Sequence, residues 1–448
     1  MKHSFVHLQV HSAYSLHYGT RRIEELVEEA AKQGYTALAL TDINNLYGVH
    51  RFIAACKERG IRPIIGSELR HGGKRTVLLC VNRNGFSNLC QLITARMRDE
   101  RFSLIENLIR YQRGLIALTD SKEIIHACKG RVKTLYALLT PFSRAVAYLA
   151  AQEGIPLAAA GDVTFLDKDD ESLHRVLRAI DKNTTVSRLE ESDCAPKGAI
   201  LFPSEKAVAI FRDFPQALEN TMRIAKVCRF DTIFEGFVFP SYPSRMLRYP
   251  GQSSFERLRE LVIEGAEMRY GEVSDAVLDR IEYELGIIQS KHFTDYFLVV
   301  ADIVKKTSRT CGRGSGAASI VAYCLAITNV DPLKYNLYFE RFLNPERMDP
   351  PDIDIDFAWD ERDAIIDSVT ADYSREFAAR VCTHNHFQYR GALREVARVY
   401  GIPSGETSAF EKHLKPGDIE KDEVWKEICE FASRMIGLPT HLGVHSGG

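Results

Sequence analysis

The stretch "PDIDIDF" (Pro351–Phe357) alternates three aspartates, Asp352, Asp354 and Asp356, with two isoleucines. In a β-strand successive side chains point to opposite faces, so the three carboxylates are expected to share one face. Adjacent carboxylates repel one another unless a cation neutralises them, and hard oxygen ligands suit Mg²⁺ or Mn²⁺. A solvated acidic edge strand, which its charges protect from aggregation, fits the bare motif equally well.

A glycine-rich segment upstream favours the metal interpretation. "GRGSGAAS" (312–319) leads into the apolar, helix-like "IVAYCLAIT" (320–328). Small residues let the backbone approach an anion, and a helix N-terminus offers unpaired N–H groups to phosphate. No Gly-Lys-Ser/Thr follows, so this is not a Walker loop. Alone, such a loop is more often a tight helix entry; together with the aspartate strand it predicts a nucleotidyltransferase palm.

Two arginines lie between the glycine loop and the aspartates. Arg341 and Arg347, in "ERFLNPER" (340–347), are candidates to neutralise phosphate charge. A structural ion pair is the alternative for either of them.

The bulk composition is that of a globular protein with several domains. The chain has 448 residues, of which 45% are hydrophobic and 26% charged, with a net charge of −2. Two or three domains are expected at this length. The ten cysteines include no CxxC pair, which favours a reducing cytoplasm over a disulfide framework or a zinc ribbon. No apolar run reaches the length of a membrane span.

The first 235 or so residues alternate strand-like and helix-like segments. "ALALTD" (37–42) and "RPIIGSEL" (62–69) are typical of strands, as is "FVHLQV" (5–10), and "RRIEELVEEAAKQGY" (21–35) has the apolar period of a helix. Repeated β–α units predict a parallel sheet or barrel with functional residues at the carboxyl ends of its strands. A Pro/Gly-punctuated boundary follows, and the chain after Asp360 is expected to be mostly helical.

These motifs together resemble the C-family bacterial replicative DNA polymerases, the α-subunits of DNA polymerase III. The palm-like segment runs from "GRGSGAAS" to "PDIDIDF", and "HLQVHSAYSL", "LTDINNLYG" and "PIIGSEL" are similar to the family's PHP domain. The resemblance implies an α/β fold: a PHP distorted β/α barrel followed by a DNA polymerase β-like palm with a helical thumb insertion. It implies the following division: 1–235 PHP domain, 236–380 linker helices and palm, 381–440 thumb, and 441–448 the start of a return to the palm.

The resemblance also implies residue roles. Gly314 and Ser315 match the loop that contacts the incoming triphosphate, and Asp352 and Asp354 match the catalytic, metal-binding aspartates, with Mg²⁺ or Mn²⁺ as cofactor. Asp356 matches a metal-site position used less directly. Arg390 and Arg394 would lie in the thumb near duplex DNA. The implied partners are primer–template DNA and dNTP, together with other polymerase subunits such as a clamp or a proofreading exonuclease.

The PHP metal site departs from the family pattern. His11, Glu68 and Asp162 match it, whereas Gln9, Ile43 and Thr164 stand where histidines are expected and Tyr18 where aspartate is common. An isoleucine cannot ligate a metal, so we expect a structural barrel without its own metals, in which His7, His17 and His174 serve packing or the surface. A PHP-type metallophosphoesterase is the alternative function, and a non-catalytic scaffold is a third.

The C-terminal end carries a further expectation. The family's third catalytic aspartate lies on a later "FDFLG"-type strand that these 448 residues do not contain. The chain is therefore expected to be an N-terminal portion that is inactive alone. "RPIIGSELR" and "FQYRGALREVARVYGIP" lean towards the error-prone branch of the family.

Overall fold

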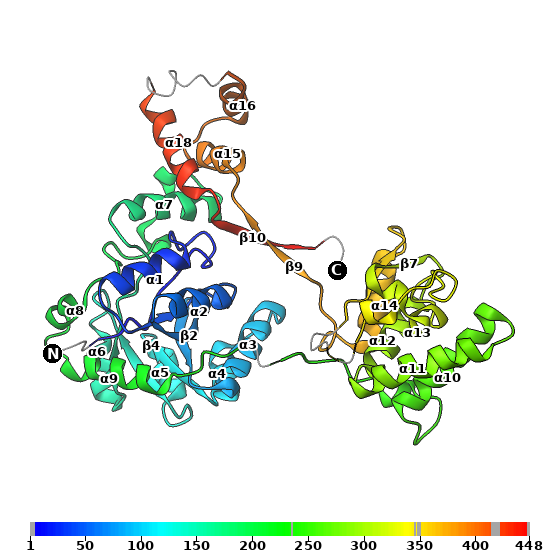
Figure 1. Cartoon of the computed structure of the whole chain (residues 1–448). Helices are drawn as coiled ribbons and strands as arrows, with labels where there is room; N and C mark the ends of the chain where they lie inside the picture. Colours follow the sequence, from blue (N-terminus) through cyan, green and yellow to red (C-terminus); the bar gives the residue numbers. More distant parts are fainter. Residues whose placement is uncertain (1–4, 234–235, 345, 347–350, 414–421, 446–448) are drawn as a thin grey trace. The chain divides into compact units, whose positions relative to one another are not determined.

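The computed structural model divides into two compact units (Figure 1). The described residues of the first unit are 5–233, 382–413 and 422–445, and those of the second are 236–344, 346 and 351–381.

The first unit is built on a six-stranded sheet in the order β1-β2-β3-β4-β5-β6. Its strands are β1 (Ala37–Leu40), β2 (Arg62–His71), β3 (Lys74–Cys80), β4 (Leu115–Thr119), β5 (Leu135–Leu139) and β6 (Leu157–Ala159). Neighbouring strands are parallel except at β3, which runs antiparallel to both β2 and β4. The expectation of an all-parallel sheet is wrong there, because Gly72 and Gly73, with φ of 57° and 73°, turn the chain into a tight hairpin.

Helices follow the strands, as the β–α alternation predicts, except at the β2–β3 hairpin. They are α1 (Ile23–Lys32), α2 (Val49–Glu58), α3 (Arg83–Arg98), α4 (Leu104–Tyr111), α5 (Lys122–Cys128), α6 (Val146–Glu153), α7 (Asp169–Asp181), α8 (Ser204–Ile210) and α9 (Pro215–Val227). Every residue of β1 and β4 is buried, which is typical of strands covered on both faces.

The predicted strand at 5–10 is instead an extended segment with one isolated bridge, Val10 to Val163. It still joins the two edges of the sheet. The N–H of Ala39 donates to the carbonyl of His7 (3.0 Å), and the N–H of Val163 donates to the carbonyl of Gln9 (3.0 Å). The sheet therefore curls into a barrel-like form, and the predicted α/β class is confirmed.

The helices after residue 381 pack on the first unit. They are α15 (Tyr389–Val399), α16 (Ser404–His413) and α18 (Glu423–Met435). Helices α7, α15 and α18 are neighbours (Figure 1), and one apolar cluster joins Leu173 and Leu177 of α7 to α15 and α18. Arg434 Nη2 also donates to the buried carboxylate of Asp170 at 3.1 Å. The segment expected to form a thumb is thus anchored to α7 of the barrel unit.

Two strands, β9 (Cys382–His386) and β10 (Pro439–Val444), flank these helices and pair antiparallel. The expectation of a mostly helical chain after Asp360 missed them. Both strands are short and rich in polar residues, so they show little of the apolar alternation by which strands are predicted.

The second unit is mainly helical. Its elements are α10 (Ser254–Tyr270), α11 (Asp275–Ser290), α12 (Thr294–Val304), β7 (Thr310–Arg313), the 3₁₀ helix η4 (Gly314–Ala318), α13 (Ile320–Cys324), the 3₁₀ helix η5 (Phe339–Arg341), β8 (Asp354–Phe357) and α14 (Arg362–Tyr373). Ser253 and Glu256 form a capping box at the start of α10. The apolar faces of α10 to α13 enclose one core, against which Ile353 and Ile355 pack.

Candidate functional site

The aspartate stretch forms the edge of a two-stranded sheet. β8 pairs antiparallel with β7, with Asp354 opposite Arg313 and Asp356 opposite Cys311. Strand β8 begins at Asp354. Asp352 therefore lies just before the strand, although the sequence predicted it to lie within the strand. The alternation still holds: Asp352, Asp354 and Asp356 are exposed, while the isoleucines between them pack on the core. The apolar side chains thus anchor a row of outward carboxylates.

The three carboxylates differ in their partners. Arg313 Nε donates to Asp356 Oδ1 at 3.3 Å. Within the described part of the chain, neither Asp352 nor Asp354 has a hydrogen-bond or ion-pair partner. Two exposed, uncompensated carboxylates suit a hard divalent cation, whereas Asp356 already has a cationic neighbour.

The glycine loop lies against Asp354. Gly314 has φ +75°, and a Cβ added there would lie 3.7 Å from Asp354 Oδ2. A Cβ at Gly312 would meet the carbonyl oxygen of Ile327 at 2.1 Å, so only glycine fits that position. Ser315 is exposed at the start of η4. The structure therefore brings Gly314 and Asp354, far apart in sequence, into direct proximity.

The expectation that the N-terminus of the following helix offers unpaired N–H groups to phosphate is wrong. The N–H groups of Ile320 and Val321 donate to the buried carboxylate of Glu284, at 3.1 and 3.2 Å. The N–H of Ala322 donates to Ser319 Oγ at 3.0 Å. Helix α13 has only five residues, and its first N–H groups are already satisfied from within the protein.

The remaining predicted residues are more widely distributed. Arg341 is exposed at the end of η5 in the second unit. Arg347 lies outside the described residues. Arg390 and Arg394 are exposed on α15, which belongs to the first unit, whereas the aspartates and the glycine loop belong to the second.

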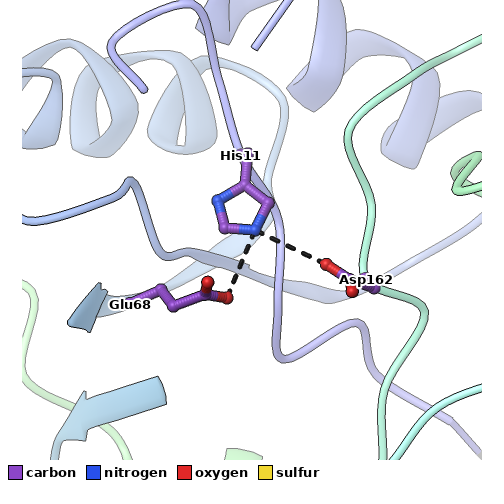
Figure 2. A group of neighbouring side chains, drawn as sticks. All are labelled: His11, Glu68 and Asp162. Carbon is purple, nitrogen blue, oxygen red and sulfur yellow. Dashed lines mark ion pairs between the residues drawn. The ribbon is translucent and has the colours of Figure 1, made fainter. Parts of the chain in front are cut away.

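In the barrel, His11, Glu68 and Asp162 converge at the ends of the strands (Figure 2). His11 Nε2 lies 3.4 Å from Glu68 Oε2 and 3.7 Å from Asp162 Oδ1, and all three side chains are buried. Among the residues that the structure describes, this is the one group of three or more His, Cys, Asp or Glu side chains close enough to share a metal ion. The three matching positions of the PHP pattern are thus assembled in space.

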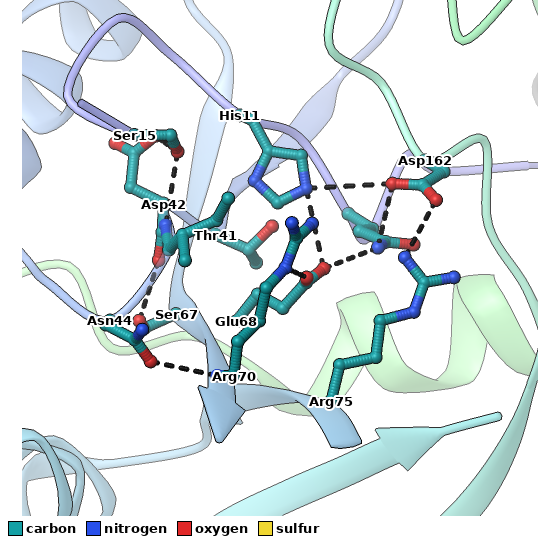
Figure 3. A network of polar contacts seen from close by, with 12 residues as sticks. His11, Ser15, Thr41, Asp42, Asn44, Ser67, Glu68, Arg70, Arg75 and Asp162 are labelled. Carbon is teal, nitrogen blue, oxygen red and sulfur yellow. Dashed lines mark hydrogen bonds and ion pairs between the residues drawn. The ribbon is translucent and has the colours of Figure 1, made fainter. Parts of the chain in front are cut away.

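The cations around this group come from the β2–β3 hairpin (Figure 3). Arg70 and Arg75 face each other across it, a like-charge pair that needs carboxylate partners. Arg70 Nε donates to Glu68 Oε1, and Arg75 Nη1 donates to Asp162 Oδ2 at 2.9 Å. Arg75 also pairs with Asp120 at 2.7 Å. We call His11, Glu68, Asp162, Gln9, Arg70 and Arg75 the barrel cluster.

Gln9, which stands where the family pattern has histidine, bridges the two carboxylates. Its Nε2 donates to Glu68 Oε2 at 2.6 Å and to Asp162 Oδ1 at 3.0 Å. With the two arginines, every carboxylate oxygen of Glu68 and Asp162 already accepts a hydrogen bond. The side chains as arranged therefore do not fit a metal ion, which would have to displace an arginine or the glutamine amide.

Electrostatics of the barrel cluster agree with this arrangement. Burial alone lowers the pKa of His11, but Glu68 and Asp162 outweigh it and raise the pKa to about 9. Burial opposes ionisation of both carboxyls, but nearby cations outweigh it. Arg70 and His11 hold the pKa of Glu68 below its usual value. His11 and Arg75 do the same for the pKa of Asp162. At neutral pH the two arginines and the protonated histidine therefore already place three positive charges here, and these would repel a metal ion.

The protonated His11 should make stability depend on pH. Because its pKa is raised from 6.5 to about 9 in the folded chain, its stabilising contribution is complete below pH 6.5 and is lost as the pH rises through 9. We expect the free energy of unfolding, measured by urea titration, to fall across this window by at most about 3 kcal/mol. A His11→Gln variant should show a flatter dependence; an unchanged dependence would contradict the assignment.

Two other histidines of the barrel, His7 and His174, are buried in the core. Nδ1 of the buried His174 donates to the carbonyl of Tyr18 at 2.6 Å, and its Nε2 accepts from the N–H of Ala195 at 2.8 Å. Burial lowers the pKa of His174 and of the buried His7 to about 4. Both are therefore neutral, and the half-buried His17 lies 3.8 Å from Asp181.

Sequence reasoning missed Arg70, Arg75 and Glu284. The first two flank the turn "HGGK" (71–74), and Arg70 is two residues after Glu68 on the same strand face. Glu284 stands in "IEYELGII" (281–288) on the apolar face of the helix with Ile281 and Ile288, where an acidic side chain signals a buried partner. Only the pairing of distant segments reveals what these side chains contact.

The amino-acid sequence matches two family models: "PHP domain" over residues 7–182 and "Bacterial DNA polymerase III alpha NTPase domain" over residues 256–448. It is 34% identical to DNA polymerase III subunit alpha of Bacillus subtilis (strain 168), over 99% of this chain and 44% of that protein. It is 32% identical to DNA polymerase III subunit alpha of Borreliella burgdorferi, over 99% of this chain and 44% of that protein. It is also 32% identical to the error-prone DNA polymerase of Symbiobacterium thermophilum, over 99% of this chain and 47% of that protein. The chain thus spans less than half the length of these relatives.

Searching the described residues for a helix long and apolar enough to cross a membrane finds none.

Proposed function

Because this chain carries matches to the PHP and DNA polymerase III alpha NTPase domains and is similar to DNA polymerase III α-subunits over 99% of its length, we propose that the protein containing it transfers deoxynucleotides from dNTP to a primer 3′-hydroxyl. In this proposal Asp352 and Asp354 hold the Mg²⁺ or Mn²⁺ ions, and Gly314 and Ser315 contact the triphosphate. Primer–template DNA is the second substrate, and Arg390 and Arg394 are candidate contacts to its backbone.

One observation carries the proposal: the glycine loop directly follows β7, the strand that pairs with the aspartate strand β8 in one small sheet. Gly314 lies beside Asp354, and Asp352 and Asp354 are exposed without partners among the described residues. A phosphate held at the loop would therefore lie within reach of a cation held by the aspartates. Bound divalent ions would favour ionisation of the attacking hydroxyl and neutralise the leaving pyrophosphate.

The protein's own residues have simple roles in this scheme. Ile353 and Ile355 fix the direction of the carboxylates by packing in the core, and Arg313 neutralises Asp356. The exposed Arg341 adds a positive charge near the segment that leads to the aspartates, where it suits phosphate oxygens.

Template-directed primer extension by the full-length protein tests the proposal. Lengthening of a labelled primer in the presence of Mg²⁺, and its absence in EDTA, is the expected result. Loss of nucleotides from the primer without any extension would overturn it in favour of a phosphoesterase.

For the barrel we propose a structural ion-pair network in place of the metals of its family. Both matched families are metal-dependent, and His11, Glu68 and Asp162 are close enough to share an ion. Three members of the cluster, Arg70, Arg75 and Asp162, also line a cavity of about 1060 Å³. However, Arg70, Arg75 and Gln9 occupy the carboxylate oxygens, so the side chains supply the cationic charge themselves. No hydrolytic step follows from this arrangement.

Metal analysis of the purified chain tests this second proposal. We expect well below one zinc or manganese ion per chain after dialysis, and no hydrolysis of a model phosphodiester. Several tightly bound ions together with hydrolysis would refute it.

A further inference from the structure

The most deeply buried carboxylate of the second unit is Glu284, whose side chain has no exposed surface. Its two oxygens accept four hydrogen bonds. Arg280 Nε donates at 2.7 Å and the N–H of Ile320 at 3.1 Å to Oε1, while Ser319 Oγ donates at 2.7 Å and the N–H of Val321 at 3.2 Å to Oε2. A single side chain of α11 thus holds the end of the glycine loop and the start of α13.

Arg280, one turn earlier on α11, extends this contact to a second segment. Its Nη2 donates to the carbonyl of Ala318, the last residue of η4, at 3.2 Å, and to the carbonyl of Leu337 at 3.1 Å. Tyr283 adds a hydrogen bond from its hydroxyl to Glu340 Oε1 at 2.6 Å. One face of α11 therefore contacts both the glycine loop and the segment that contains Arg341.

Helix capping alone does not explain this arrangement. Ser319 already caps α13 by accepting from the N–H of Ala322, and the helix is only five residues long. Burying a carboxylate is costly unless its partners are in place, and burial raises the pKa of Glu284 although Arg280 and the donors at Ser319 and Ile320 oppose the rise. An apolar side chain would avoid this cost but would leave the N–H groups of Ile320 and Val321 without their acceptor. What the carboxylate adds is a fixed direction for the backbone that enters and leaves the loop.

We infer that Glu284 and Arg280 are positioning residues that fix the loop Gly314–Ala318 beside Asp354. This inference rests on the proposed nucleotidyl transfer, in which the loop contacts the triphosphate. Neither residue reaches the exposed face of the loop. They act through Ser319, Ile320 and the carbonyl of Ala318.

Glu284→Gln tests the inference in the full-length protein. The glutamine has the same shape, but its amide NH₂ replaces one of the two oxygens, so the N–H of either Ile320 or Val321 loses its acceptor. Losing a hydrogen bond to a charged group corresponds to about a tenfold change, so we expect KM for dNTP to rise about tenfold. Affinity for primer–template DNA, measured separately, should stay within twofold of wild type.

Glu282→Gln is the matched control. Glu282 lies on the same helix but is exposed and pairs with Arg259, so its variant should resemble the wild-type protein. Arg280→Lys keeps the charge beside Glu284 but cannot also reach the carbonyls of Ala318 and Leu337. We expect KM for dNTP in Arg280→Lys to lie between the values for Glu282→Gln and Glu284→Gln. If Glu284→Gln does not fold, Arg280→Lys alone tests the inference.

Amide hydrogen exchange separates this inference from the proposed function. In Glu284→Gln we expect faster exchange at residues 314–321, with exchange in α10 and α12 unchanged. If the wild-type protein extends no primer, the proposed function fails, and the exchange result still decides whether α11 holds the loop. A KM within twofold of wild type in both variants, or exchange at 314–321 like that of wild type, overturns the inference.

Discussion

Replacing Asp354 by asparagine is expected to lower primer extension by the full-length protein about 10³-fold or more. The substitution keeps the size of the side chain and removes its charge. A metal ion contributes several kcal/mol of transition-state stabilisation, and about 4 kcal/mol corresponds to a factor of 10³ in rate. Asp352→Asn should have a similar effect, because both carboxylates are exposed and have no partner among the described residues. Folding should be almost unaffected, since substitutions at such surface positions are usually worth less than about 0.5 kcal/mol.

Asp356→Asn is the matched control for this experiment. Asp356 lies on the same strand face but accepts a hydrogen bond from Arg313, so its charge is already compensated. We expect a loss of activity of less than about tenfold. Steady-state incorporation of a single nucleotide, with circular dichroism to verify folding, gives both values. An Asp354→Asn protein within tenfold of wild type would refute the assignment of the metal ligands.

Replacing Arg75 by methionine is expected to destabilise the barrel unit by about 3–5 kcal/mol, because removing one partner leaves a buried charge uncompensated. The Asp162 side chain is only 1% exposed, and Arg75 is its guanidinium partner as well as that of Asp120. Methionine keeps the long apolar stem, so the change isolates the loss of charge. Urea-induced unfolding, monitored by circular dichroism, measures the effect.

Lys74→Met is the control, one residue earlier on β3. Lys74 pairs with Glu123, whose side chain is 68% exposed, and an ion pair of this kind contributes no more than about 1 kcal/mol. An Arg75→Met/Asp162→Asn double variant should recover part of the stability, because the unpaired charge is then absent. Equal stability of Arg75→Met and Lys74→Met would show that the arginine does not replace a metal cation.

Several features were predictable from local sequence. The β–α alternation of the first unit, the helices of the second and the outward alternation of the aspartates follow from apolar periodicity. The antiparallel β3 and the polar strands β9 and β10 escaped prediction, because their pairing depends on a tight glycine turn and on segments far apart in the chain.

For the candidate site as well, the local motifs were predictable from the sequence, but the contacts between distant segments were not. The motifs that carry the resemblance are contiguous runs of residues, whereas Glu284 contacts Ser319, Ile320 and Val321, which are 35 or more residues away. A lone buried carboxylate in a helix shows that a partner exists but not which one it is.

By itself the sequence determined the resemblance to DNA polymerase III α-subunits, the α/β class and the carboxylate and glycine motifs, because each depends on residue types at short spacing. Only the tertiary structure decided what compensates the buried carboxylates. In the barrel, Arg70, Arg75 and His11 neutralise Glu68 and Asp162. Beside the glycine loop, the first N–H groups of α13 donate to Glu284 and are not free for phosphate. The physical reason is that charge compensation acts through space: a buried carboxylate needs a cation or donor within a few ångströms, and folding alone determines which residue of the chain supplies it.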